Sequence, residues 1–233
     1  MSVPGPINAR LSLRAAGDMG PSSGPNPLRD RWLLQHGYAP ESTALRRQTH
    51  SRQVVVVERE SAAACHIEAD GMLSADRDLS LAVTVADCMP IFLFDRATGA
   101  FGLLHSGWKG TGVAAIALEL MRRHWGIEAA DLDVVLGPCI GACCYRVDET
   151  RARAYAAEWG GAAVRTGPEA AYYLDLRAAN IALLQERGVA RITVVSDCTV
   201  CNERLGSFRR EGAERFTRML AVMTGATGQE QEL

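Results

Sequence analysis

The sequence predicts an α/β fold in which helices cover a mixed β-sheet, and three observations support this class. Apolar, β-branched runs such as LSLAVTVA at 79–86 have the composition of buried strands. Segments with helical spacing and capping residues alternate with these runs along the chain. The 233 residues contain no internal repeat and no low-complexity linker. We therefore expect one domain over 1–233, with loosely ordered ends at 1–24 and 224–233.

The predicted strands are short apolar segments bounded by turn residues. The VVVV run is too apolar and too β-branched to be anything but a buried strand, and RITVVSD is the last strong strand signal. In chain order the predicted strands are ARLSLR at 9–14, VVVV at 54–57, LSLAVTVA at 79–86, GAFGLL at 99–104, LDVVLG at 132–137, a short one at 173–174, and RITVVSD at 191–197.

Capping residues define the predicted helices. Asn26 as N-cap, Pro27 at the first helical position and Gly37 beyond the end predict a helix over 27–36. Asp175 caps a second, which ends at Gly188. The remaining predicted helices are 112–125, which has a core-facing apolar stripe, 149–159, and a terminal amphipathic helix that runs through Met223.

The stretch 79–112 combines two buried strands with chemically capable residues at their ends. The first strand ends at Asp87 and Cys88, and the second ends at His105. SGWKGTG follows His105 and leads into a predicted helix start. A strand, a glycine-rich turn and the start of a helix together form a concave surface that is lined by backbone N–H groups. A cysteine and a histidine at its rim indicate a functional site.

Composition excludes several classes of protein. A formal net charge of -2 and a pI near 6.2 give no general attraction to nucleic acid or to a membrane surface. No apolar run reaches membrane-spanning length, and the first residues contain no signal-peptide core. Seven cysteines scattered through apolar segments fit a reducing cytoplasm better than a disulfide framework. We therefore expect a cytoplasmic protein.

His50, Cys88 and His105 are a candidate metal-binding set. Each lies at the boundary of a predicted strand, and neighbouring strands bring such boundaries together. Catalytic zinc takes three protein ligands of these types and keeps a fourth position open. The spacing alone leaves open whether the three meet, and a lone histidine such as His50 can equally be a surface or packing residue.

A competing set consists of the Cys198-Thr-Val-Cys201 pair together with Cys143 and Cys144. A Cys-x-x-Cys pair is a zinc or redox signal, but adjacent cysteines do not easily chelate one tetrahedral ion. NERLGSFRR after the pair lacks the apolar periodicity of a thioredoxin-like helix. We expect a structural role for this pair. Cys65 and His66 are adjacent and are expected to belong to an ordinary turn.

Phosphate-binding and nucleophile signals are weaker. GWKGTG lacks the residue order of a P-loop, although Lys109 and the pair Arg209-Arg210 could supply charge to a phosphate. Without further support each is equally a solvated surface charge. Cys88 beside Asp87, with histidines elsewhere, could also be a cysteine-hydrolase nucleophile. Metal and nucleophile roles therefore remain alternatives for Cys88.

Eight segments together resemble the YfiH-like, laccase-domain family of polyphenol oxidases and purine nucleoside phosphorylases. The resemblance covers nearly the whole chain. The matching segments are LRAAGDMG at 13–20, RQTHS at 47–51, ADG at 69–71, TVADCMPI at 84–91, HSGWKGT at 105–111, GPCIGACCYRV at 137–147, LDL at 174–176 and SFRREG at 207–212.

The resemblance implies a single three-layer α/β/α domain with a catalytic Zn²⁺ held by His50, Cys88 and His105. It also implies phosphorolysis of purine nucleosides (adenosine, inosine, guanosine and methylthioadenosine), with adenosine deamination as a companion activity. Expected partners are nucleosides and phosphate, with no nucleic acid or membrane, in a monomer or weak homodimer. Asp87 is the expected proton shuttle beside Cys88.

Lys109, Arg210 and Arg14 are the expected phosphate contacts. Lys109 stands where the family often has Arg, and Ser106 where it more often has Ala. The Lys109 difference replaces a bidentate fork by a point charge. Two alternative functions stay open: a copper-dependent polyphenol oxidase on the same ligands, and a cysteine amidase acting on a cell-wall precursor. Five histidines are too few for a multicopper centre, and a binding module would leave the Cys, His and Asp residues unexplained.

Overall fold

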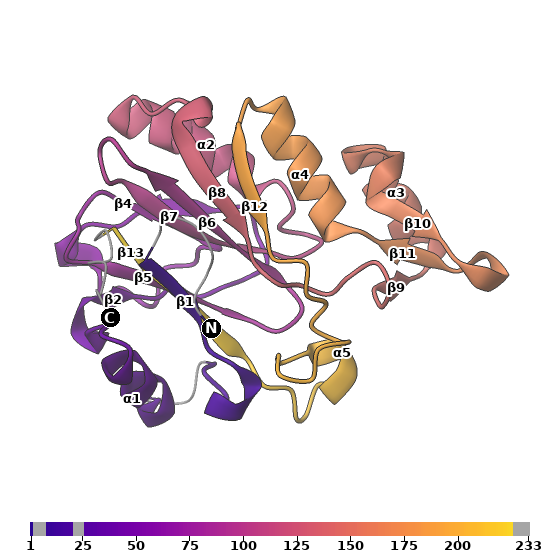
Figure 1. Ribbon diagram of the computed structural model, residues 1–233, viewed down its shortest axis with the longest axis horizontal. Helices are drawn as coiled ribbons and strands as arrows, with labels where there is room; N and C mark the ends of the chain where they lie inside the picture. Colours follow the sequence, from indigo (N-terminus) through magenta and orange to yellow (C-terminus); the bar gives the residue numbers. More distant parts are fainter. Residues whose placement is uncertain (2–7, 21–25, 226–233) are drawn as a thin grey trace, which may run out of the picture.

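The computed structural model describes residues 1, 8–20 and 26–225, which form stacked β-sheets between layers of helices (Figure 1). Residues 2–7, 21–25 and 226–233 lie outside this description, and with them lies much of the two ends that we expect to be loosely ordered. The helices are α1 (Pro27–Gln35), α2 (Val113–Trp125), α3 (Glu149–Trp159), α4 (Leu176–Glu186) and the short α5 (Phe208–Glu211).

The strands of the described residues form three sheets. A six-stranded mixed sheet has the order β12-β8-β6-β7-β4-β3, and a four-stranded mixed sheet has the order β1-β13-β5-β2. A small antiparallel sheet has the order β10-β11-β9. The bounds are β1 (Asn8–Leu11), β2 (Thr43–Ala44), β3 (Val54–Val56), β4 (Gly71–Ser74), β5 (Ser80–Val85), β6 (Met89–Asp95), β7 (Phe101–Ser106), β8 (Leu132–Leu136), β9 (Arg146–Val147), β10 (Val164–Thr166), β11 (Tyr172–Leu174), β12 (Arg191–Val194) and β13 (Met219–Thr224).

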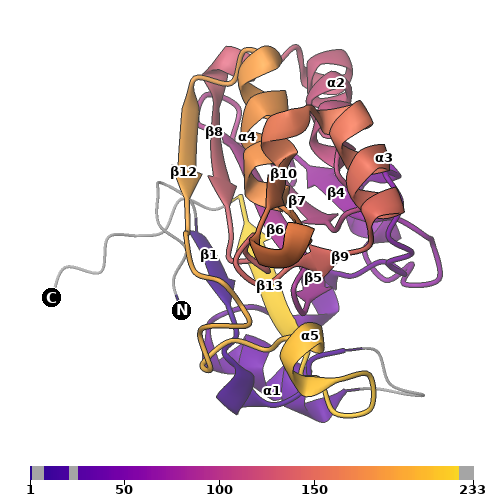
Figure 2. The ribbon, with the colours of Figure 1, turned by 90° about the vertical axis from the view of Figure 1, so that its right-hand side faces the viewer.

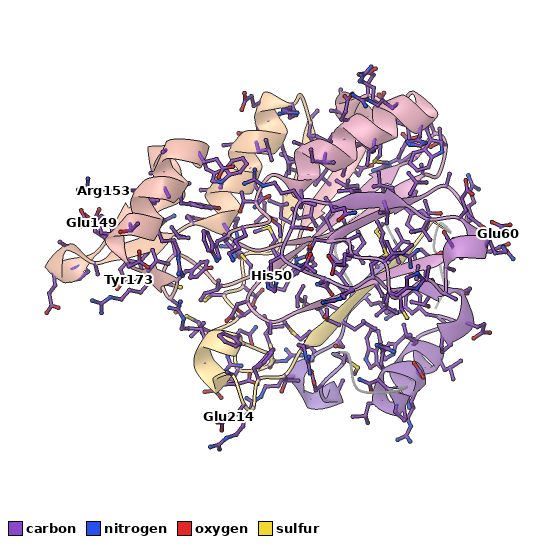
Figure 3. The ribbon with its side chains drawn as sticks, turned by 180° about the vertical axis from the view of Figure 1, so that it is seen from behind. His50, Glu60, Glu149, Arg153, Tyr173 and Glu214 are labelled. Carbon is purple, nitrogen blue, oxygen red and sulfur yellow. The ribbon has the colours of Figure 1, made fainter. Side chains whose placement is uncertain are left out.

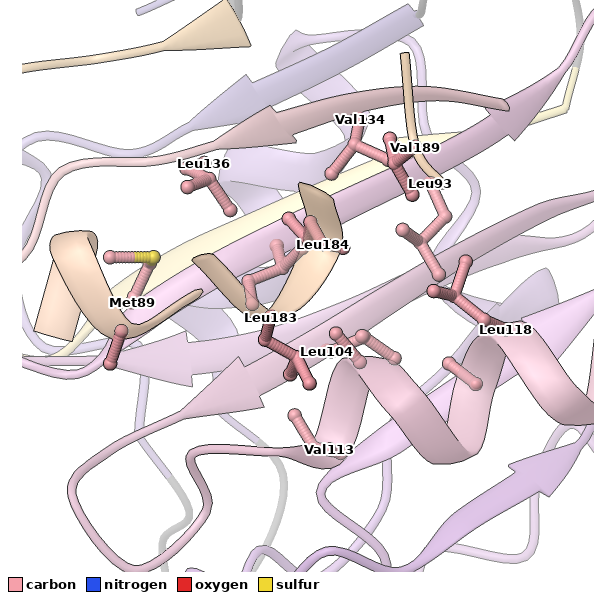
Figure 4. Packing of buried hydrophobic residues seen from close by; sticks show 14 of the residues in the cluster. Met89, Leu93, Leu104, Val113, Leu118, Val134, Leu136, Leu183, Leu184 and Val189 are labelled. Atoms are coloured by element: carbon pink, nitrogen blue, oxygen red, sulfur yellow. The ribbon is translucent and has the colours of Figure 1, made fainter. Parts of the chain in front are cut away.

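Helices α2 and α4 cover one face of the six-stranded sheet. Their apolar side chains pack against strand residues in one fully buried cluster (Figure 4). The cluster includes Val113, Leu118, Leu183 and Leu184 from the helices and Met89, Leu93, Leu104, Val134 and Leu136 from the strands. Burying each such side chain contributes about 1.5–3 kcal/mol, so this layer makes the sheet a rigid support.

The opposite face of the six-stranded sheet packs on the four-stranded sheet. Phe92, Phe101 and Leu103 meet alternate residues of β5 and β13 in a second cluster. The residues on the opposite face of β13, Leu220 and Val222, pack against α1. Figure 2 shows α1 on the side of the molecule opposite α2 and α4. The predicted α/β class with mixed sheets is confirmed, with two stacked sheets between the helix layers where we expect one.

Several local predictions are confirmed by the capping contacts. The Asn26 side chain accepts a hydrogen bond from the backbone N–H of Arg29 at the start of α1. The Asp175 side chain accepts one from Ala178 N–H at the start of α4. Helix α3 has the predicted bounds. These elements could be predicted because their signals are local.

The predicted terminal helix through Met223 is wrong. Residues 219–224 form β13, which lies between β1 and β5 and is buried on both faces. A strand buried on both faces is a continuous apolar run, which has no periodicity to distinguish it from a buried helix. Because β13 follows it, β12 is not the last strand. Strand β6, which is central in the six-stranded sheet, is a similar continuous apolar run and is missing from the predicted strands for the same reason.

The sheet register gathers the candidate residues at one edge. Pro90 of β6 pairs with His105 of β7, and Gly71 of β4 pairs with Leu104 of β7. The β5–β6 turn, the end of β7 and the residue before β4 therefore lie side by side. Among the described residues, no helix has the length and apolar character that crossing a bilayer requires.

Candidate metal and substrate site

His50, Cys88 and His105 meet at the edge of the six-stranded sheet. One nitrogen of each histidine and the Cys88 sulfur all lie within 4.8 Å of one another. The two imidazole rings are 4.9 Å apart between centroids and inclined at 75°. His105 is only 3% exposed, whereas His50 is exposed. The three candidate ligands are thus brought together, with one side of the set open.

Asp70 is the buried group that holds this set in place. Its Oδ1 accepts hydrogen bonds from His105 Nδ1 at 2.7 Å and from the backbone N–H of His50 at 3.0 Å. Its Oδ2 accepts from Ser51 N–H at 2.6 Å and from Ser51 Oγ at 2.7 Å. Because Nδ1 of His105 is engaged, Nε2 is the nitrogen available to a metal ion or to Cys88. In the sequence Asp70 stands out only as part of the ADG motif at 69–71, with no role assigned to it.

The environment favours the charged forms of the pair Cys88 and His105. Burial by itself raises the pKa of the Cys88 thiol, but the charge of His105 and hydrogen bonds from both imidazoles outweigh it and lower the pKa to about 6. Burial lowers the pKa of His105, but the Cys88 thiolate and Asp70 outweigh it and raise the pKa to about 9. Burial also raises the pKa of Asp70, yet its hydrogen bonds hold it well below the usual range.

The local backbone is shaped to bring these side chains close. His50 and Asp87 both have positive φ angles, 59° and 82°, which L-residues rarely adopt. A Cβ atom added at Gly107 would lie 2.7 Å from the Cys88 sulfur. Only glycine therefore fits at 107, and the glycine of the HSGW motif serves the close approach of the chain to Cys88.

Asp87 is held by two contacts from distant parts of the sequence. Thr199 Oγ1 donates to its Oδ1 at 2.6 Å, and the backbone N–H of Arg209 donates to its Oδ2 at 2.7 Å. The backbone carbonyl of Asp87 accepts from Ile140 N–H. The predicted catalytic residues Asp87 and Cys88 therefore share one anchored turn.

A cavity of about 1030 Å³ opens over the histidines and Cys88. This volume is at the upper end of ordinary small-molecule sites. Asp87 is the one carboxylate among the described lining residues, whereas the lining contains six guanidinium groups. They belong to Arg29, Arg46, Arg47, Arg151, Arg209 and Arg218. Four of the six form ion pairs with carboxylates outside the lining: Arg29 with Asp30, Arg47 with Glu68, Arg151 with Asp148 and Arg218 with Asp18. The positive charge that remains suits an anionic ligand.

Two of these arginines lie beside aromatic rings next to the histidines and Cys88. The Arg151 guanidinium carbon is 4.8 Å from the centre of the Trp108 ring, and that of Arg209 is 5.5 Å from the Tyr145 ring. Burial, with a smaller effect of the Cys88 charge, raises the pKa of Tyr145 well above its ordinary value, while Arg151 and Arg209 oppose the shift. Tyr145 therefore lies within the electrostatic influence of Cys88 and of both guanidinium groups.

Two further aromatic side chains line the cavity near its rim. Phe208 and Phe216 have ring centroids 5.0 Å apart in an edge-to-face arrangement, and Phe208 is 48% exposed. An exposed aromatic ring over a cavity offers a stacking surface for a flat heterocycle.

The three predicted phosphate contacts are engaged elsewhere and do not line the cavity. Arg210 donates to the backbone carbonyls of Thr199 and Val200 and forms an ion pair with Glu211 at 2.8 Å. Arg14 is 3.7 Å from Glu211. The Lys109 ammonium lies 5.5 Å from the Trp108 ring centre. Their predicted contact with phosphate stays a prediction. Arg151, which lines the cavity, was not among the predicted residues, because no local motif gave a signal for it.

The comparisons with known proteins agree with this geometry. A family profile described as multi-copper polyphenol oxidoreductase laccase matches residues 27–225. A purine nucleoside phosphorylase of Corynebacterium glutamicum is 32% identical over 76% of this chain and 72% of its own. Purine nucleoside phosphorylase YlmD of Geobacillus stearothermophilus is 35% identical over 66% of this chain and 59% of its own.

Solved structures show the same fold. The crystal structure of YlmD from Geobacillus stearothermophilus superposes with a TM-score of 0.86 at 27% identity, covering 94% of this chain and 92% of that one. A Bacillus licheniformis protein, YfiH, gives a TM-score of 0.82 at 27% identity, with the same coverage.

Proposed function

The chain belongs to the multi-copper polyphenol oxidoreductase laccase family, and we propose that it is a zinc-dependent purine nucleoside phosphorylase. The observation that carries the proposal is the position of the set His50, Cys88 and His105 at the floor of an arginine-rich, aromatic cavity. The names of its curated relatives support the same substrate class.

The donor set fits a catalytic zinc ion. Two imidazoles and one thiolate are ligands that zinc accepts, and three protein ligands leave a position open. The hydrogen bond from His105 Nδ1 to Asp70 is the second contact that a metal-binding histidine ordinarily makes. When bound, the ion would supply a Lewis acid that stabilises developing negative charge and activates water. A trinuclear copper centre needs more imidazoles than the two gathered here, which favours zinc.

The arginines of the cavity are suited to hold phosphate. We assign this role to Arg151 and Arg209, because both line the cavity that contains Cys88 and both lie beside aromatic rings of that lining, Trp108 and Tyr145. Guanidinium groups bind phosphate oxygens in bidentate fashion. In phosphorolysis a phosphate oxygen forms a bond to the anomeric carbon while the bond from that carbon to the purine nitrogen breaks, and the purine gains a proton.

The aromatic side chains are suited to hold the base. Phe208, Phe216 and Trp108 all line the cavity, and the exposed Phe208 ring offers a face to a purine. Asp87 lies beside Cys88 and faces the cavity, and its carboxylate oxygens retain lone pairs beyond their two hydrogen bonds. We assign Asp87 the proton transfer to or from the base. Adenosine deamination would use the same base pocket with water in place of phosphate.

One alternative rests on a specific observation. The Cys88 thiol has a lowered pKa of about 6 and lies beside His105, which is also the arrangement of a cysteine hydrolase nucleophile and its base. A cysteine amidase would be indifferent to chelators and inactivated by a thiol reagent. A zinc-dependent phosphorylase would instead lose its activity when a chelator removes the metal ion.

The test is an incubation of metal-quantified protein with adenosine, with and without phosphate, followed by chromatography. We expect phosphate-dependent release of adenine, which is lost on chelation and restored by added zinc. Inosine formed without phosphate would report the deaminase reaction. No turnover by zinc-loaded protein contradicts the proposal. Phenol oxidation that requires added copper would instead support the oxidase.

A further inference from the structure

A second cysteine cluster lies on two loops outside the cavity. Cys143 and Cys144 belong to the turn after β8, and Cys198 and Cys201 belong to the loop after β12. The four sulfur atoms all lie within 4.8 Å of one another. Cys201 is central, since its sulfur is 3.7 Å from that of Cys143 and 3.5 Å from that of Cys144.

From this geometry we propose that the four cysteines form a structural site for a single zinc ion. With zinc–sulfur bonds of about 2.3 Å, the edge of a tetrahedron of sulfurs is about 3.8 Å. The two separations given above are close to that edge, before any ion draws the thiolates together. A site with four thiolates is closed, which is typical of structural rather than catalytic zinc.

The turn at 141–145 overcomes the expected difficulty of chelation by adjacent cysteines. The N–H groups of Cys144 and Tyr145 both donate to the carbonyl of Gly141 at 2.9 Å, which makes the chain turn tightly. In this turn both neighbouring thiols reach Cys201. The sequence alone gives no information on this, because an extended chain would point adjacent side chains in opposite directions.

A backbone N–H group contacts one of the thiols. Gly141 N–H donates to the Cys198 sulfur at 3.2 Å. Such a contact stabilises a thiolate, the form that binds metal. A Cβ at Gly141 would lie 3.1 Å from the Cys143 sulfur and 3.4 Å from that of Cys198. The glycine therefore leaves space for these two sulfurs.

The cluster also has the access that a metal site needs. Cys143 and Cys201 are exposed, and all four cysteines are free thiols. A single disulfide would engage only two of the four thiols, whereas one metal ion engages all four.

A zinc ion at this position would fasten two loops that support Asp87. Thr199, inside the Cys-x-x-Cys segment, donates to Asp87, and Ile140 in the facing loop donates to the Asp87 carbonyl. Cys139 and Cys198 already form an isolated β-bridge between the loops. The ion would therefore join the two loops, and the inference does not rest on the proposed nucleoside chemistry, although a loosened Asp87 would slow it.

The experiment counts zinc in protein purified under reducing conditions without chelators. We expect two equivalents in the wild type, one in Cys88→Ala and one in Cys198→Ser/Cys201→Ser. Cys65→Ser, which removes an exposed cysteine outside both clusters, serves as the matched control and should keep two. An unchanged zinc content in the double variant overturns the proposal.

Cobalt substitution tests the site without relying on a variant of the cluster itself. Co²⁺ bound to Cys88→Ala protein should give the intense sulfur-to-metal absorption of a tetrahedral four-thiolate complex. Added zinc should protect four thiols of that variant from alkylation until a chelator is added. A weak spectrum with no protection contradicts the proposal, as does a denatured, non-reduced wild-type protein with five free thiols instead of seven, which indicates a disulfide.

Discussion

The two cysteine-containing clusters differ in their ligand atoms, their support and their access to the cavity. The cluster of His50, Cys88 and His105 combines two imidazoles with one thiol at strand ends, and the fully buried Asp70 orients it. The cluster of Cys143, Cys144, Cys198 and Cys201 lies on loops, and none of its members lines the cavity. Three donors beside a cavity favour chemistry on a ligand, whereas four thiols away from it favour loop attachment.

The largest expected effect comes from Cys88→Ala. Removal of the only thiol in the three-donor set should reduce adenine release by on the order of 10³-fold or more, which is the scale for loss of a central catalytic group. Circular dichroism and zinc content check that the variant folds and loses one ion. A Cys88→Ala variant with the wild-type rate and undiminished zinc would contradict the assignment of catalysis to the cluster of His50, Cys88 and His105.

Asp70→Asn should have the next largest effect. Both oxygens of the Asp70 carboxylate accept hydrogen bonds, from His105, His50 and Ser51. In the asparagine variant an NH₂ group replaces one of these oxygens, so at least one N–H or O–H donor loses its acceptor and faces another donor. Loss of such a supporting contact lowers metal affinity or activity by about 10–100-fold. Competition with a chromogenic chelator measures the affinity. The four-thiolate site should keep its affinity, and equal weakening of both sites would contradict the assignment.

Arg151→Ala and Arg209→Ala should each raise the KM for phosphate. A hydrogen bond to a charged group contributes about 1.5–3 kcal/mol, which corresponds to about 10–100-fold. Arg153→Ala is the matched control for Arg151, because Arg153 lies on the same helix, is 77% exposed and pairs with Glu149. Figure 3 shows Arg153 and Glu149 at the edge of the molecule, away from His50. A KM unchanged in both cavity variants would place phosphate elsewhere.

The pH dependence of thiol alkylation should also distinguish the two clusters, although the expected difference is smaller than in the preceding experiments. In metal-depleted protein the Cys88 alkylation rate should rise through a pKa of about 6 and level off above it, since the thiolate is the reactive form. Burial and hydrogen bonds with Cys201 raise the pKa of Cys144 well above its ordinary value, so its rate should still be rising at pH 9. Mass spectrometry of labelled peptides gives both profiles. A Cys88 profile centred near 8.5 would contradict the proposed pairing with His105.

Sequence reasoning was most successful where signals are local. The caps at Asn26 and Asp175 and the strand ends at Cys88 and His105 could all be predicted from a few neighbouring residues. The meeting of His50 with Cys88 and His105 was first only a possibility raised by spacing, and the strand pairing brings them together.

The features that could not be predicted from the sequence depend on contacts between distant segments. Strand β13 pairs with β1 across almost the whole chain, with Asn8 opposite Thr224, and no local pattern encodes that pairing. The guanidinium groups of Arg209 and Arg210 both donate to backbone carbonyls, but only Arg209 of the two lines the cavity. Which arginine faces the cavity depends on packing between distant segments, so it could not be read from SFRREG.

The most direct test measures zinc content and phosphate-dependent adenine release on the same preparations of three proteins. The account predicts two zinc ions and full release for the wild type, one ion and no release for Cys88→Ala, and one ion with residual release for Cys198→Ser/Cys201→Ser. Release by Cys88→Ala at the wild-type rate would contradict the proposed function. Two ions in the double variant would contradict the four-thiolate site and leave the function intact.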